Sequence, residues 1–384
     1  IIHLITNPLA GIYIHIPFCK QACHYCNFHF TTSLRYKDDF VKALLSEIEL
    51  QKDYLSHENI ETIYFGGGTP SLLSIVELQC ILNKLQKHFT ISQDCEITLE
   101  TNPDDISTPK LQDWKLAGIN RLSIGVQSFF EEDLQWMNRA HHARQALDSL
   151  MLALPYFNNL TVDLIYGLPG MSHEKWQQNV ETVLALKIPH LSCYALTVEP
   201  KTPLDKLIKQ HRAEDISPDK QAEQFLLLMQ WLEAAGYEHY EISNFAKPGM
   251  RSRHNTSYWQ GKKYLGLGPS AHSYNGNERQ WNIANNQQYI AAMQQQKIIA
   301  EKEILTYTQK LNEYIMTALR TMEGIDLDVL SLQFEIPADS FLKRMDKYMQ
   351  SNKVVRKENF LQLTREGKLL ADGIAADLFY LSAQ

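Results

Sequence analysis

The sequence predicts an α/β protein with a partial (β/α)6 barrel, followed by an α+β C-terminal region that includes a winged-helix-like domain. Between Gly11 and about Tyr237, short β-branched runs alternate with amphipathic helical stretches, as in parallel β/α units. From Glu238 the composition becomes rich in Gly, Asn and Tyr, and after Tyr307 helical stretches precede two short strand-like runs. We therefore expect a barrel over 8–237, a connecting segment over 238–305 and a C-terminal domain over 306–384.

Composition and charge are those of an ordinary globular protein. Hydrophobic residues make up 44% and charged residues 21% of the 384 residues, which excludes disordered and fibrous classes. The formal net charge of -7 argues against general binding to nucleic acid or anionic membranes. No apolar run approaches the ~20 residues of a membrane span and no signal-peptide pattern is present, so we expect a cytoplasmic protein. Because the chain starts with Ile1 rather than Met, we expect a few residues to precede it.

The first region is predicted to hold six strands that alternate with helices. The strands are expected at Gly11–Pro17, Thr62–Gly66, Glu96–Thr101, Arg121–Gln127, Thr161–Tyr166 and His190–Thr197. The helices are expected at Lys37–Leu55, Ile75–His88, from Thr108 onward, and at Gln145–Tyr156, His173–Leu186 and Asp219–Ala235. Ser74 and Glu77 form a capping box before the second helix. An open doubly wound sheet is the alternative arrangement of the same units.

The remainder of the chain reads differently. The connecting segment has few long apolar runs, which is typical of loops and edge strands. After Tyr307 come three helical stretches, a β-wing over Lys353–Thr364 and a helix over Arg365–Phe379, the order of a winged helix. Winged helices often bind DNA, but residues 306–384 carry 10 Lys and Arg against 11 Asp and Glu. A DNA-binding wing is normally basic, so we expect no nucleic-acid partner.

Three of the six cysteines lie within eight residues, directly after the first predicted strand. Their spacing is Cys19-x3-Cys23-x2-Cys26, which suits metal ligation in a reducing compartment. Zinc sites and cubane iron–sulfur clusters both use four donors, so one position is left open. His24 or His29 completes a zinc site, or one iron of a cluster stays without a protein ligand and can bind a substrate.

Further polar and glycine residues follow the other strands. The run Gly66-Gly67-Gly68-Thr69-Pro70 follows the second strand and offers backbone N–H groups to a charged ligand. Three polar side chains lie at or within the next strands: Glu100, Gln127 and Asp163. Any one of them alone is better explained as a cap or a strand-end hydrogen bond. Because parallel strands end at one edge, together they predict a binding site there.

The cysteine spacing and the strand leading into it resemble the radical S-adenosylmethionine superfamily. The resemblance implies a [4Fe-4S] cluster held by Cys19, Cys23 and Cys26, with the amino and carboxylate groups of S-adenosylmethionine on the fourth iron. It implies that S-adenosylmethionine contacts residues at the family's motif positions, namely Tyr13, Tyr25, Gly67, Gly68, Thr69, Glu100, Gln127 and Asp163. We add Arg139, whose guanidinium fork can clamp a carboxylate.

Within that superfamily the motif order looks like the oxygen-independent coproporphyrinogen III oxidase family. One branch is the decarboxylating dehydrogenase of heme biosynthesis, which carries a fourth cysteine where this chain has Phe28. The other branch holds the heme chaperones called HemW, whose His-Asn-x-x-Tyr-Trp motif matches His254 to Trp259 here. That match implies heme on His254, with Tyr258 and Trp259 against the macrocycle. His272 is a second candidate ligand, and Cys193 is better explained as a buried structural cysteine.

The resemblance implies a heme chaperone that carries one [4Fe-4S] cluster and S-adenosylmethionine and hands heme to acceptor proteins, such as respiratory enzymes. It also implies a flavodoxin- or ferredoxin-type reductant and transient contact with membrane proteins. The alternative function is the coproporphyrinogen III dehydrogenase itself, which Phe28 disfavours. A winged-helix regulator with a redox-sensing cluster is a third hypothesis, and the acidic balance of the C-terminal region weakens it.

Overall fold

The computed structural model describes residues 9–381, which divide into two compact units. The first comprises 9–217 and 262–303, and the second comprises 218–261 and 304–381. The segment 238–305 therefore contributes to both units, while the expected boundaries after 237 and 305 stay predictions. Within the described residues, no helix is long and apolar enough to cross a membrane.

The first unit is built on six parallel strands that neighbour one another in chain order. Their bounds are β1 Leu9–Ile16, β2 Asn59–Gly67, β3 Ile91–Thr101, β4 Arg121–Gln127, β5 Leu160–Tyr166 and β6 His190–Ala195. The consecutive order is that of a β/α barrel, since a doubly wound sheet reverses strand order at a switch point. The partial barrel is thus confirmed, and the doubly wound alternative is wrong.

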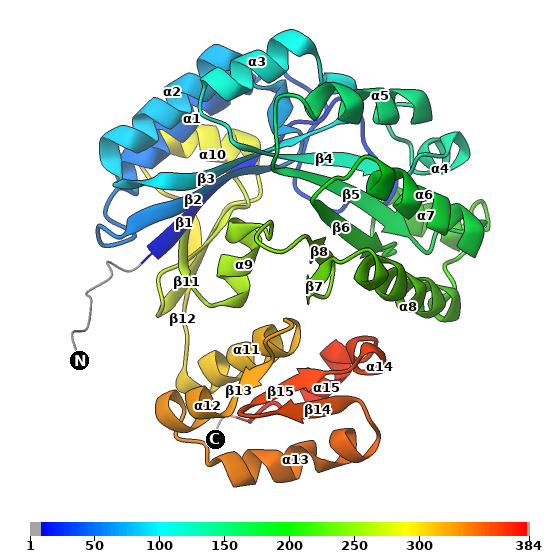
Figure 1. The fold of residues 1–384 in the computed structure, drawn as a ribbon. Helices are drawn as coiled ribbons and strands as arrows, with labels where there is room; N and C mark the ends of the chain where they lie inside the picture. The colour runs from blue at the N-terminus through cyan, green and yellow to red at the C-terminus, as the bar shows by residue number, and fades with distance from the viewer. Residues whose placement is uncertain (1–8, 382–384) are drawn as a thin grey trace. The chain divides into compact units, whose positions relative to one another are not determined.

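Helices cover the outer face of these strands. Figure 1 shows α1, α2 and α3 together over one face of β1 to β4. The bounds are α1 Lys37–Leu50, α2 Ile75–His88, α3 Thr108–Leu116, α4 Glu131–Trp136, α5 Ala143–Ala153, α6 His173–Ala185 and α7 Pro203–Lys209, with short 3-10 turns η1 Pro70–Leu72 and η2 Pro103–Asp105. Alternate residues of β1, such as Ile12 and Ile14, are fully buried, as is Leu44 of α1. The predicted capping box of Ser74 and Glu77 is present.

Four further strands extend the sheet beyond β1, and one helix lies between two of them in the chain. They are β9 Lys263–Leu267, β10 His272–Tyr274, β11 Glu278–Asn282, β12 Ala300–Ile304 and α10 Asn286–Gln294. Strand β9 pairs parallel with β1, which the polar, glycine-rich sequence did not reveal. The buried carboxylate of Glu47 in α1 anchors this segment, because it accepts hydrogen bonds from Gly268 N at 2.7 Å and Asn282 Nδ2 at 2.6 Å. The return of the chain to β1 therefore depends on contacts between distant residues.

The second unit contains the predicted winged-helix order. Its elements are α8 Pro218–Ala234, β7 Glu238–Glu241, β8 Asn244–Ala246, α9 Arg253–Trp259, α11 Tyr307–Leu319, β13 Ile325–Asp326, α12 Leu327–Gln333, α13 Ala338–Gln350, β14 Val354–Lys357, β15 Phe360–Leu363, α14 Arg365–Lys368 and α15 Ala371–Asp377. The three-stranded sheet has the order β13-β15-β14. Leu361 of β15 is buried in one hydrophobic core cluster with Leu311 and Phe341. The predicted single helix over 365–379 is two helices. The break falls between Lys368 and Ala371. A Cβ on Gly367 would clash with Lys353 O, so α14 lies directly against the backbone that leads into β14.

Candidate functional site

A cavity of about 430 Å³ opens at the ends of the parallel strands in the first unit. In a β/α barrel this edge is where loops from several strands meet and ligands bind. The cavity is lined by nearly all the residues predicted for the cluster and S-adenosylmethionine, namely Cys19, Cys23, Tyr25, Cys26, Gly67, Gly68, Thr69, Glu100, Gln127, Arg139 and Asp163. Tyr13 is the exception. Its hydroxyl donates to His15 Nδ1 at 3.3 Å and its ring stacks on Tyr64, outside the cavity lining.

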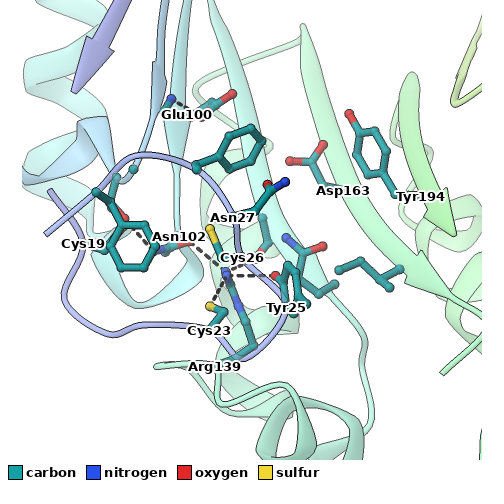
Figure 2. A pocket seen from close by; sticks show the side chains of 18 of the residues that line it. Cys19, Cys23, Tyr25, Cys26, Asn27, Glu100, Asn102, Arg139, Asp163 and Tyr194 are labelled. Atoms are coloured by element: carbon teal, nitrogen blue, oxygen red, sulfur yellow. Dashed lines mark hydrogen bonds between the residues drawn. The ribbon is translucent and has the colours of Figure 1, made fainter. Parts of the chain in front are cut away.

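The three clustered cysteines are free thiols on the loop after β1. Each is half-buried, and Figure 2 shows their side chains together with Arg139 at one side of the cavity. The loop is tied at both ends, because Cys19 N donates to Thr31 O at 3.0 Å and Phe18 forms a bridge with Thr31. The three thiols therefore lie on one wall of the site and face the open cavity.

The segment after α4 clamps the middle of this loop. Gln21 Nε2 donates to Asn138 Oδ1 at 2.9 Å, and Asn138 Nδ2 donates to Ala22 O at 2.8 Å. Asn138 has a φ of 57°, a left-handed conformation that asparagine tolerates better than most residues. His24 N donates to Met137 O at 3.1 Å. The loop that carries the thiols is thus held by the Asn138 side chain and by the backbone of Met137.

The two histidines proposed for the zinc alternative do not line the cavity, and one ring nitrogen of each is hydrogen-bonded elsewhere. His24 Nδ1 donates to Trp136 O at 2.9 Å, and His29 Nε2 donates to Asn286 Oδ1 at 2.7 Å. In the part of the chain that the structure describes, no three His, Cys, Asp or Glu groups are arranged to bind a single metal ion. This arrangement weakens the zinc hypothesis. It fits three thiols that each bind a different iron of a cluster better than three thiols that bind one tetrahedral ion together.

The glycine-rich loop serves packing rather than offering free donors, contrary to our expectation. Gly67 N donates to Glu100 Oε2 at 3.2 Å, and Gly68 N and Thr69 N donate to Ile16 O and Phe18 O at 2.8 and 2.7 Å. A Cβ on Gly68 would lie 2.6 Å from Phe18 O, which cannot move aside without shifting the backbone. The glycines therefore let the second βα loop lie directly against the loop of the cysteines.

Two carboxylates face the cavity from β3 and β5. Burial raises the pKa of Glu100 to about 7, although Tyr64 OH donates to its Oε1 at 2.7 Å. Burial also raises the pKa of Asp163 to about 6, against hydrogen bonds from Ser192 and Ser123. Figure 2 shows Asp163 across the cavity from the cysteines, near Tyr194. A cationic ligand in the cavity would lower the pKa of both carboxyls, because it stabilises their ionised form.

Arg139 is largely occupied by the protein itself. Its Nη2 donates to Asn102 Oδ1 at 2.8 Å and to Gly125 O at 2.7 Å, and its Nη1 lies 3.3 Å from Cys23 Sγ. Nη1 also reaches Tyr25 OH at 3.5 Å. The buried Nε has no hydrogen-bond partner among the described residues. The guanidinium therefore has one unpaired donor, the buried Nε–H, instead of the open fork that the sequence suggested.

Gln127 ends β4 in a left-handed conformation, with a φ of 70°. A non-glycine residue in this region is strained, and such strain is common at binding sites. The register between β4 and β5 shifts over the same residues, Ile124 to Gln127. The shift turns the strand end toward the cavity that Gln127 lines.

Several lining residues were not singled out from the sequence. They are Asn27, Asn102, Tyr194 and Glu199. Phe28, which was singled out from the sequence, also borders the cavity and is 65% exposed. Asn102 lies two residues after Glu100 and could have been found by its place at a strand end. Tyr194 and Glu199 come from β6 and its loop, where no sequence motif marks a binding site.

The predicted heme residues lie in the second unit, on α9. His254 is 1% exposed, and its Nε2 shares a hydrogen bond of 2.8 Å with Tyr258 OH. The guanidinium of Arg320 lies 5.4 Å from the ring centre of Trp259. In the first unit, His272 is exposed and its ring stacks on Trp281 at 6.1 Å, while Cys193 is buried. The motif residues His254 and Tyr258 thus contact each other in a closed arrangement.

Comparisons with known proteins match this architecture. The Radical SAM superfamily model matches residues 13–183, and the HemN C-terminal domain model matches residues 305–370. A solved structure titled as coproporphyrinogen III oxidase (HemN) from Escherichia coli has a TM-score of 0.83 and 25% identity, over 97% of this chain and 90% of that one.

Curated relatives are similar over nearly the full chain. The heme chaperone HemW of Bacillus subtilis is 34% identical, over 95% of this chain and 98% of its own length. The heme chaperone HemW of Escherichia coli is 31% identical, over 97% and 98%. A mouse mitochondrial protein named for its radical S-adenosyl methionine domain is 38% identical over 68% of this chain and 60% of its own length. The chain therefore belongs to the HemW family of the radical SAM superfamily.

Proposed function

We propose that this protein is a heme chaperone that binds one [4Fe-4S] cluster, S-adenosylmethionine and heme, and delivers heme to acceptor proteins. The observation that supports it most is the similarity to two proteins named as HemW over at least 95% of this chain. Membership of the radical SAM superfamily implies the cluster and S-adenosylmethionine. Respiratory enzymes are the acceptors we propose, with a flavodoxin- or ferredoxin-type reductant and transient contact with membrane proteins.

The residues around the cavity fit a cluster that is open on one side. Cys19, Cys23 and Cys26 are free thiols that line the same cavity, and neither His24 nor His29 is among the residues that line it. Four-iron clusters are held by thiolates, so three leave one iron for S-adenosylmethionine. When bound, the cluster supplies an electron and an iron site for the amino and carboxylate groups of that ligand.

The same cavity offers complementary charge to S-adenosylmethionine, which carries a cationic sulfonium and ammonium beside a carboxylate. Glu100 and Asp163 line it on one side and accept protons readily in the empty protein, because burial raises their pKa values to about 7 and about 6. The free Nε–H of Arg139 supplies a donor to a carboxylate. Binding of the cationic ligand should therefore ionise both carboxyls.

Heme binding at His254 requires the closed arrangement on α9 to open. The imidazole Nε2 that would bind iron is occupied by the hydroxyl of Tyr258, and the side chain is 1% exposed. We propose that Tyr258 moves aside when heme binds and that its ring then packs against the macrocycle. His272 is accessible without such a change, and its neighbour Trp281 offers a flat aromatic surface.

The experiment that tests this function compares two assays on the anaerobically reconstituted chain. We expect stoichiometric heme binding and no conversion of coproporphyrinogen III to protoporphyrinogen IX with reductant and S-adenosylmethionine. Phe28 occupies the position of the dehydrogenase's fourth cysteine, which is our reason to expect no turnover. Turnover to protoporphyrinogen IX would overturn the chaperone proposal in favour of the dehydrogenase.

A further inference from the structure

One asparagine connects two of the three clustered thiols. Asn102 Oδ1 accepts a hydrogen bond from Arg139 Nη2 at 2.8 Å, and Arg139 Nη1 points to Cys23 Sγ at 3.3 Å. On its other side, Asn102 Nδ2 donates to Thr69 Oγ1 at 3.2 Å. Thr69 and Cys19 line the same cavity, and hydrogen bonding from the Thr69 hydroxyl lowers the pKa of the Cys19 thiol against the effect of its burial. Figure 2 shows Asn102 between Cys19 and Arg139, with hydrogen bonds on both sides.

The directions of these hydrogen bonds are mutually consistent. An amide has two donors and an acceptor with two lone pairs, so Asn102 can accept from arginine and donate to threonine at once. Because Thr69 Oγ1 receives that donor, its own proton is free to point at Cys19. Both ends of the relay therefore direct a donor at sulfur. An alanine would remove both links, and an aspartate would supply no donor to Thr69.

The backbone of Asn102 is set for this role. It lies immediately after β3 and before Pro103, with φ of -92° and ψ of 150°. A following proline disfavours the helical region and restricts a residue to such extended angles. Thr69 is 2% exposed and Arg139 is further held by Gly125 O, so neither partner swings freely. The amide thus joins two side chains that are themselves restrained.

We propose that Asn102 is a positioning residue that holds the Arg139 and Thr69 donors on Cys23 and Cys19, and thereby fixes two of the cluster's ligands and the binding of S-adenosylmethionine. The proposal rests on the cluster and S-adenosylmethionine sites proposed above. Donors to the sulfurs of an iron–sulfur cluster tune its potential, and partners that orient metal ligands affect metal retention by about 10- to 100-fold. Asn102 also lines the cavity itself, so its loss should weaken the binding of S-adenosylmethionine as well as loosen the thiols.

The test uses the full chain, reconstituted anaerobically with iron and sulfide, and the variant Asn102→Ala. We expect EDTA to strip its iron about tenfold faster than that of the unmodified chain. We also expect weaker binding of S-adenosylmethionine and a more negative cluster potential, because two donors to sulfur are loosened. Heme binding on α9 should be unchanged.

A matched control is Asn120→Ala. Asn120 also makes two side-chain hydrogen bonds, from Ile97 N and to Cys95 O, both at 2.8 Å, but it lies just before β4, beside the middle of β3, and does not line the cavity. This variant should lose stability while keeping iron retention, ligand affinity and potential. Equal behaviour of the Asn102 and Asn120 variants would show that Asn102 has only a structural role and would overturn the proposal.

A double-mutant cycle tests whether Asn102 acts through its partner. Thr69→Val removes the hydroxyl with little change of shape. The double variant Thr69→Val, Asn102→Ala should lose iron only slightly faster than Asn102→Ala alone. Fully additive losses would contradict a shared path to Cys19. If the unmodified chain itself takes up no cluster, the proposed function fails together with the relay. If it loads normally and Asn102→Ala retains iron equally well, the relay alone is wrong.

Discussion

Replacing Glu100 by glutamine should stabilise the ligand-free protein at high pH and destabilise it slightly at low pH. Burial holds the pKa of this carboxyl at about 7 in the folded chain, above its ordinary value of 4.5. The folded state therefore binds the proton more tightly than the unfolded state does. Below pH 4.5 both states are protonated, and as the pH rises from 4.5 through 7 the free energy of unfolding falls.

The magnitude follows from these two values. The difference between 4.5 and about 7 corresponds to about 3 kcal/mol of lost stability at pH 8. Glutamine keeps an acceptor for Tyr64 OH but loses the one for Gly67 N, which costs about 1 kcal/mol. We expect a net gain of about 2 kcal/mol at pH 8, and a loss of about 1 kcal/mol at pH 4.5.

The assay is urea unfolding of the cluster-free chain and its Glu100→Gln variant at a series of pH values. The same variant should bind S-adenosylmethionine more weakly, because it lacks the charge that faces the cationic ligand. Stability and ligand binding would then oppose each other at one residue, as expected for a binding site. A stability difference between the two proteins that does not change between pH 4.5 and 8 would contradict this prediction. It would show that Glu100 ionises normally in the fold.

Three further substitutions test other parts of the account. Cys23→Ser should abolish the brown absorbance of the cluster while leaving the fold largely intact, and unchanged iron and sulfide content would contradict it. His254→Ala should weaken or abolish heme binding but spare the cluster; if its heme Soret band is unaltered while His272→Ala loses the band, His272 is the ligand. Gly68→Ala should lower the free energy of unfolding by about 3 kcal/mol, because its Cβ would lie 2.6 Å from Phe18 O. Urea denaturation measures this loss, and Gly373→Ala, where nothing lies within 4 Å of the added Cβ, should be neutral or slightly stabilising.

The parts of the fold that could be predicted from the sequence are those governed by local pattern. The expected strand over 121–127 and helix over 75–88 have the same bounds in the structure, because β-branched residues and a capping box mark them directly. The return of β9 to pair with β1 was not predictable in this way. It depends on Glu47 binding Gly268 and Asn282, more than 200 residues away along the chain.

The candidate site shows the same division. The gathering of the cysteines, Glu100 and Asp163 around one cavity follows from the rule that parallel strands end at one edge. The state of each side chain does not follow from it. The glycine-loop N–H groups are already bonded and the fork of Arg139 is mostly occupied, since each depends on which distant acceptor folds against it. For the same reason, the motif around His254 gave no sign that its imidazole is buried against Tyr258.

The proposed function requires that one chain holds both a cluster and heme. The most direct measurement is an anaerobic absorption titration of heme into the cluster-loaded full chain, with cluster and heme bands followed together. We predict that the Soret band saturates at a fixed ratio of heme to protein while the cluster absorbance is retained. A heme signal that rises without saturation, or that appears only as the cluster is lost, would contradict the claim.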